Sequence, residues 1–118
     1  MFRPNLGLRG IAVITAVSLG GGAVLANDQP YSANSIMPGC RQYLLAPGKV
    51  TDFYHVGVCH GAIIALSYIS DNCSPAEVTN DQLVRVIVQY VDARPARMHE
   101  NFVKLALEAV KAAWPCQR

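Results

Sequence analysis

Residues 79–91 read TNDQLVRVIVQYV, and this run decides whether the chain is all-helical or mixed. Three of its valines occupy alternate positions, which partly fits a strand. Thr79 and Gln82, however, have the spacing of a capping box, in which two side chains satisfy the free N–H groups of a first helical turn. We therefore predict a helix that ends before Pro95. Its apolar stripe comprises Leu83, Ile87 and either Tyr90 or Val91.

Residues 98–114, MHENFVKLALEAVKAAW, form the clearest helical pattern in the chain. Lys104, Glu108 and Lys111 lie opposite the apolar residues at distances suited to ion pairing along a helix, and Pro115 ends the segment. The predicted apolar stripe comprises Phe102, Leu105, Ala106, Ala109, Val110 and Ala113.

The segment DFYHVGVCHG, residues 52–61, predicts the start of another helix, because Thr51 or Asp52 is able to cap it. Its apolar positions then recur at steps of three and four. Gly57 and Gly61 are weak helix formers, so we expect them to mark close packing by a neighbouring element. The apolar positions are Val56, Cys59, Ile63, Leu66 and either Ile69 or Ser70.

A shorter helix is predicted within residues 36–48, IMPGCRQYLLAPG, with its stop at Pro47 and Gly48. Asn-Gly and Asp-Gly pairs, the strongest signals of a β-hairpin, are absent from the sequence. The chain is therefore predicted to be a small all-α domain of four helices.

Residues 1–26 have the pattern of a cleaved signal peptide: Arg3 and Arg9, an apolar run, and small residues up to Ala26. The run is shorter than the ~20 residues that a membrane-spanning helix needs. We expect residues 27–34 to be a flexible lead-in and residues 35–118 to be the folded domain, which is not held in a membrane. Without the leader, eight basic residues face eight acidic ones, so the charge pattern gives no indication of nucleic-acid binding.

Four cysteines in an exported chain favour a disulfide framework, and their number alone allows three pairings. Short connections make consecutive helices antiparallel neighbours. A hairpin of the first two helices brings Cys40 towards Cys59, and a hairpin of the last two brings Cys116 towards Cys73. We therefore predict the disulfides Cys40–Cys59 and Cys73–Cys116.

His55 and His60 flank Cys59, and His55 would lie on the same helix face as Cys59. Such a pair could supply two ligands of a zinc site or form a Cys/His nucleophile. Both alternatives need a thiolate, and oxidation of the cysteines removes it. Phosphate loops, dinucleotide fingerprints and hydrolase motifs are absent from the sequence. We expect no enzymatic activity, no cofactor and no metal.

Arg94, Arg97, His99 and Glu100 cluster around Pro95. Such a cluster is either a solvated turn or a polar recognition loop, since binding residues favour loops held on a rigid scaffold. We select it as the candidate partner-binding site. The aromatic residues of the helical segments are interpreted either as core or as a binding surface: Tyr43, Phe53, Tyr54, Tyr68 and Tyr90.

From Phe53 to Cys116 the chain resembles the Rap/Tai family, periplasmic immunity proteins that protect Gram-negative bacteria from type VI secretion effectors, mainly peptidoglycan amidases. The resemblance rests on three segments in order: FYHVGVCHGAIIAL, CSPAEVTNDQLVRVIVQYV and RPARMHENFVKLALEAVKAAWPC. The chain departs from the family at Arg94-Pro95-Ala96, where the family often has His followed by Pro-Glu.

The resemblance implies an all-helical fold, internal disulfides, a tendency to homodimerise, and function by occluding the active site of a cell-wall amidase. It implies a periplasmic location and no catalysis. The alternative that the residues permit is a stand-alone periplasmic protein with a stress or chaperone-like role, since the chain is 52% hydrophobic.

Overall fold

The computed structural model describes residues 29–69, 71 and 73–117, and this part of the chain is helical throughout its regular elements. The predicted all-α class with four helices is confirmed. The predicted signal peptide, residues 1–26, lies outside the described residues. The elements are α1 (Ala33–Tyr43), α2 (Phe53–Ile69), α3 (Asn80–Asp92), the short 3₁₀ helix η1 (Pro95–Arg97) and α4 (Phe102–Ala113).

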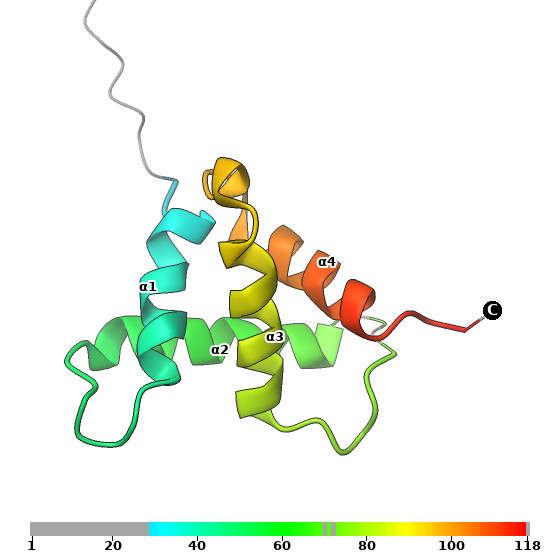
Figure 1. Ribbon diagram of the computed structural model, residues 1–118, viewed down its shortest axis with the longest axis horizontal. Coiled ribbons are helices and arrows are strands. Elements are labelled where there is room, and N and C mark those ends of the chain that lie inside the picture. The colour runs from blue at the N-terminus through cyan, green and yellow to red at the C-terminus, as the bar shows by residue number, and fades with distance from the viewer. Residues whose placement is uncertain (1–28, 70, 72, 118) are drawn as a thin grey trace, which may run out of the picture.

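The helices form two layers (Figure 1). In the view of Figure 1, α2 runs behind α1 and α3, and both cross it steeply. One hydrophobic core fills the space between the layers, because each of the four helices contributes buried side chains to it. The largest fully buried ones are Phe102, Met37, Ile63, Ile87 and Leu105.

The backbones of α1 and α2 lie in close contact. A Cβ atom at Gly39 would overlap the backbone carbonyl group of His55, so only glycine lets the two helices approach this closely. The next residue, Cys40, forms the predicted disulfide with Cys59, and both cysteines are fully buried. A covalent bond and a backbone contact therefore fix the crossing of α1 on α2.

In the described part of the protomer, no element packs closely against the two glycines that we expected to mark close packing. A Cβ atom at Gly57 or Gly61 would meet no atom within 4 Å outside the helix. Both glycines are exposed on α2, and the close approach occurs at Gly39 of α1 instead. Sequence patterns mark a glycine inside a helix but do not tell which side of the helix is covered.

The start and end of α1 differ from the predicted ones. Ser32 is the N-cap, since its hydroxyl accepts a hydrogen bond from the backbone N–H of Ser35, and the helix begins at Ala33. Residues 32–34 therefore belong to the folded domain, which corrects the boundary placed at residue 35. The helix ends at Tyr43, four residues before Pro47, because Leu44 and Leu45 donate to carbonyls three residues back and close a tighter turn.

The other helix ends follow the sequence closely. The Asp52 carboxylate accepts the backbone N–H of His55 at the start of α2, and the Thr79 hydroxyl accepts that of Gln82 at the start of α3. The Asn101 side chain caps α4 in the same way. The buried stripe of α4 contains every predicted residue except Ala113, which is exposed.

The second predicted disulfide, Cys73–Cys116, is also present. It joins the segment before α3 to the segment after α4, and both of its cysteines are exposed. All four cysteines are therefore paired, and each of the two pairs of consecutive helices, α1–α2 and α3–α4, called hairpins below, has one disulfide. The antiparallel arrangement that we expected does not hold for α1 and α2, which cross steeply (Figure 1).

Candidate functional site

The loop between α3 and α4 holds the four residues selected from the sequence, and η1 forms its middle. Arg97 is the centre of an ion-pair network. Its guanidinium donates to the Glu100 carboxylate at 2.7 and 2.9 Å and to the Glu108 carboxylate at 2.7 and 3.0 Å. Because Glu108 lies on α4, the network fastens the loop to that helix.

The charges of this network reinforce one another. Hydrogen bonds from Arg97, and then from Lys104, lower the pKa of Glu100 to about 2. Arg97 also lowers the pKa of Glu108, and the Tyr90 hydroxyl adds a hydrogen bond to it at 3.1 Å. In return the two carboxylates, Glu100 before Glu108, raise the pKa of Arg97. The two carboxylates and the Arg97 guanidinium each favour the charged form of the other.

Arg94 and His99 have other surroundings. The Arg94 guanidinium lies 3.5 Å from the centre of the Tyr90 ring and donates to the Tyr90 carbonyl oxygen at 2.8 Å. His99 is exposed. The structure thus brings Arg97 and Glu100 together, packs the Arg94 side chain against Tyr90 of α3, and leaves the His99 ring at the surface.

The loop is also tied to the start of α1. The carbonyl oxygens of Met98 and Glu100 accept the backbone N–H groups of Asn34 and Ala33, at 2.8 and 2.9 Å. Ser32 and Asn101 form an antiparallel bridge beside them. The loop therefore has backbone attachments to α1 and side-chain attachments to α3 and α4, so its outer surface is held in one shape.

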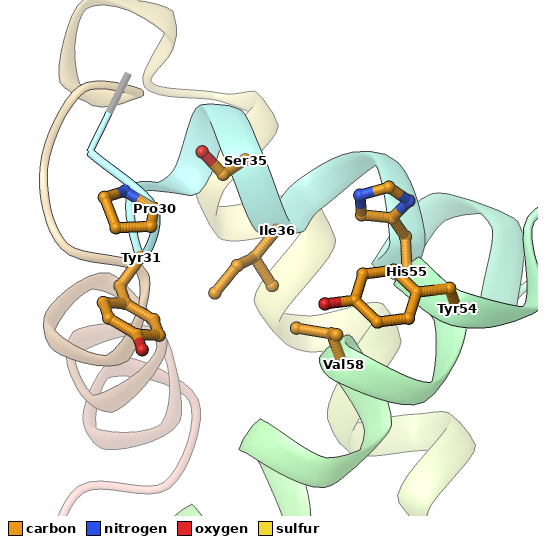
Figure 2. A pocket seen from close by; sticks show the side chains of 7 residues that line it. All are labelled: Pro30, Tyr31, Ser35, Ile36, Tyr54, His55 and Val58. Carbon is orange, nitrogen blue, oxygen red and sulfur yellow. The ribbon is translucent and has the colours of Figure 1, made fainter. Parts of the chain in front are cut away.

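A cleft of about 290 Å³ lies between the start of α1 and the first turns of α2. We did not predict this cleft from the sequence. Figure 2 shows the Tyr31 and Tyr54 rings on its two sides with Ile36 and Val58 between them. Tyr31 is 67% exposed and Tyr54 is 75% exposed. Pro30, Ser35 and His55 complete the lining. Two exposed tyrosines around apolar side chains are typical of a protein-binding surface.

The histidines that flank Cys59 have structural partners. The His55 imidazole pairs with the Asp52 carboxylate, and the backbone N–H and then the imidazole of His55 lower the pKa of Asp52. The His60 ring stacks on Tyr43, with 5.2 Å between ring centres. Cys59 is in a disulfide and supplies no thiolate. Among the described residues, no group of three His, Cys, Asp or Glu side chains lies close enough together to hold a metal ion.

The five aromatic residues of the helices divide between core and surface. Tyr43 and Tyr90 are partly buried against the core, whereas Phe53, Tyr54 and Tyr68 are exposed, by 76%, 75% and 86%. All three exposed rings belong to α2. No helix in the described part of the chain is long and apolar enough to cross a membrane.

The fold defines a small, disulfide-closed helical protein with a polar, fastened α3–α4 loop and exposed aromatic side chains along α2. A family model described as Rap1a immunity proteins matches residues 32–116, and the chain belongs to this family. Immunity proteins bind secreted effectors and are typically not enzymes, and two disulfides fit an exported protein. No curated protein and no solved structure matches the chain.

Proposed function

We propose that this chain is a periplasmic immunity protein that binds a type VI-secreted peptidoglycan amidase and blocks its active site. The family match over residues 32–116 carries the proposal. The pairing of all four cysteines supports a location in an oxidising compartment such as the periplasm. Cleavage of residues 1–26 and assembly into a homodimer, which the family resemblance implies, are part of the proposal.

The loop around η1 is the proposed contact with the amidase. Pro95, Ala96 and His99 form its exposed surface, and Arg97 with Glu100 holds it in shape from behind. A loop that is rigid before binding loses little conformational entropy when it enters a cleft, which favours tight inhibition. Arg97 and Glu100 are accordingly positioning residues, and His99 is the side chain that contacts the partner.

The experiment is a protection and binding assay. Type VI amidases are expressed one at a time in the periplasm, with and without this protein, and lysis is followed. For an amidase that is neutralised, the purified proteins are expected to form an inactive complex of nanomolar affinity, since occluding inhibitors reach that range. The proposed immunity function is wrong if no amidase is neutralised and deletion of the gene leaves survival of type VI attack unchanged.

Variants then test the loop. His99→Ala is expected to weaken amidase binding at least tenfold with no change in thermal stability, because the ring is exposed and its loss leaves the Arg97 network intact. Lys111→Ala, which removes an exposed side chain from the last turn of α4, is the matched control and is expected to bind normally. Equal affinity of both variants would place the contact elsewhere.

A second candidate function is the stand-alone chaperone-like role, favoured by the exposed aromatic side chains of α2. It predicts that the protein suppresses aggregation of an unfolded client in the absence of any amidase. A protein that neutralises an amidase but has no effect on client aggregation would exclude this role.

A further inference from the structure

The outer face of α2 is an apolar surface that the described part of the protomer leaves uncovered. We define it as Phe53, Tyr54, Gly57, Gly61, Ala65 and Tyr68, all of which are exposed. The opposite side of the helix carries Cys59, Ile63 and Leu66, which are buried in the core. A helix that is apolar on both sides is ordinarily covered on both sides.

Charge is missing from this face. Residues 53–69 contain no Asp, Glu, Lys or Arg. The two histidines of the helix are directed elsewhere, His55 to Asp52 and His60 to Tyr43. Two such faces brought together would therefore meet without repulsion between like charges, and no ionised group would lose its hydration.

The order of large and small residues along the face is symmetric about Gly61. Gly57 and Ala65 lie four residues to either side of it, and Tyr54 and Tyr68 lie seven residues to either side. An interface with two-fold symmetry requires a patch that is complementary to itself. If two α2 helices cross antiparallel at Gly61, each small residue faces a small residue and each tyrosine faces a tyrosine.

The sizes also fit the geometry of crossed helices. Crossed helices are closest where they cross and diverge towards their ends, so small residues belong at the centre and large ones at the ends. A Cβ atom at Gly57 or Gly61 meets nothing within the protomer, so these positions are open to a neighbour. The α1–α2 crossing at Gly39 uses the same device inside the protomer.

The area is sufficient for a stable dimer. The three exposed aromatic side chains would together bury on the order of 500 Å² per protomer. The smaller residues bring the total towards ~700 Å², close to the ~800 Å² per partner of a standard interface.

We propose that the outer face of α2 is the homodimer interface, with the two-fold axis at Gly61 and antiparallel α2 helices. This inference rests on the homodimer included in the proposed function and names its surface. Figure 1 shows η1 at the end of α1 and α3 that is remote from α2, so this dimer leaves both η1 loops accessible. Each protomer is then free to bind one amidase.

The test uses the fact that a residue on a two-fold axis faces its own copy. Gly61→Glu and Gly61→Lys each place like charges opposite each other, and each is expected to weaken the dimer at least tenfold in sedimentation or light-scattering measurements over a concentration series. Gly61 is exposed and a Cβ atom there meets nothing within 4 Å, and both variants replace glycine by a better helix former. Thermal stability of the monomer is therefore retained.

Mixing the two variants is the decisive step. One Gly61→Glu protomer and one Gly61→Lys protomer are expected to form a one-to-one heterodimer, since opposite charges then meet at the axis. Ala112→Glu, a charge added at an exposed position of α4, is the control and is expected to dimerise like the wild type. Mixtures that stay monomeric would overturn the axis position, and a Gly61→Glu protein that dimerises normally would overturn the interface.

The same samples separate this inference from the proposed function. If the wild type dimerises through α2 but no amidase is bound, the interface stands and the immunity role fails. If the wild type is monomeric and Gly61→Glu abolishes amidase binding, the face is the contact with the effector and the dimer is wrong.

Discussion

The two helical hairpins, α1–α2 and α3–α4, each have a disulfide, but they are held together by different means. In α1–α2 the disulfide Cys40–Cys59 is fully buried, and the backbone of Gly39 contacts that of His55. In α3–α4 the disulfide Cys73–Cys116 is exposed, and the loop end is held by the long side chains of Arg97 and Glu108.

The two kinds of contact should respond differently to substitutions. A backbone contact beside a buried covalent bond has no flexible part, so a single added atom forces the helices apart. Long charged side chains adjust their rotamers, and water replaces them at modest cost. We expect changes at the Gly39 contact and the buried disulfide to destabilise the protein strongly, and changes to the charged side chains of the α3–α4 loop to alter chiefly the surface that the loop presents.

Removal of each disulfide is the strongest test of this contrast. Loop-closure entropy alone gives roughly 3 kcal/mol for Cys40–Cys59, which spans 19 residues, and roughly 4 kcal/mol for Cys73–Cys116, which spans 43. Replacing the buried pair by alanine also leaves a cavity, which adds about 2 kcal/mol. The buried disulfide should therefore cost more in urea unfolding, although its loop is the shorter. The reverse order would show that loop closure dominates both.

The glycine contact gives the next largest effect. Gly39→Ala is expected to destabilise the protein by about 2–3 kcal/mol, because the added methyl group meets backbone that is fixed by the neighbouring disulfide. Gly57→Ala is the matched control: it adds the same methyl group to an open position and should stabilise the protomer by about 0.5–1 kcal/mol. Urea unfolding of both variants at low protein concentration measures the difference. Equal stability of the two variants would rule out Gly39 as the close contact.

These two hairpins also show what the sequence was able to predict. Local periodicity, capping residues and cysteine parity predicted the four helices and both disulfides, because each depends on neighbours along the chain or on short connections. Gly39 was missed, since its role depends on a helix packed across it. The start of α1 was read as a polar linker because the cap formed by Ser32 is stabilised by contacts with residues 98–102.

The sequence indicated the polar cluster of the α3–α4 loop but not the contacts that hold it. A cluster of polar residues around Pro95 is visible in the sequence, but the partner that immobilises Arg97 is Glu108, one helix further on. The exposed apolar face of α2 is visible in the sequence as a run of seventeen residues without Asp, Glu, Lys or Arg, and we did not predict the face from it. Periodicity does not distinguish a helix covered on both sides from one with a face left open.

The α3–α4 loop should respond to acid. The folded-state pKa of Glu100, about 2, lies below its ordinary value of 4.5, so its contribution to stability is present above pH 4.5 and is lost as the pH falls from 4.5 towards 2. Glu100→Gln should reduce the loss of thermal stability over this range, with an effect smaller than that of Gly39→Ala at neutral pH. Asp71→Asn, which removes a carboxylate outside the network, is the control. Identical pH profiles for Glu100→Gln and the wild type would contradict the assignment.

The smallest effect is expected where the two hairpins are joined by a surface ion pair, Arg41 of α1 with Asp92 at the end of α3. Its N–O distance is 2.6 Å, but the two side chains are 45% and 42% exposed. Solvent screening therefore limits the coupling energy to about 0.5 kcal/mol. A double-mutant cycle with Arg41→Gln and Asp92→Asn should give this value at low salt and close to zero at high salt. A coupling energy that is larger and does not depend on salt would contradict this expectation. It would mean that a rigid contact also joins α1 to α3, as one joins α1 to α2.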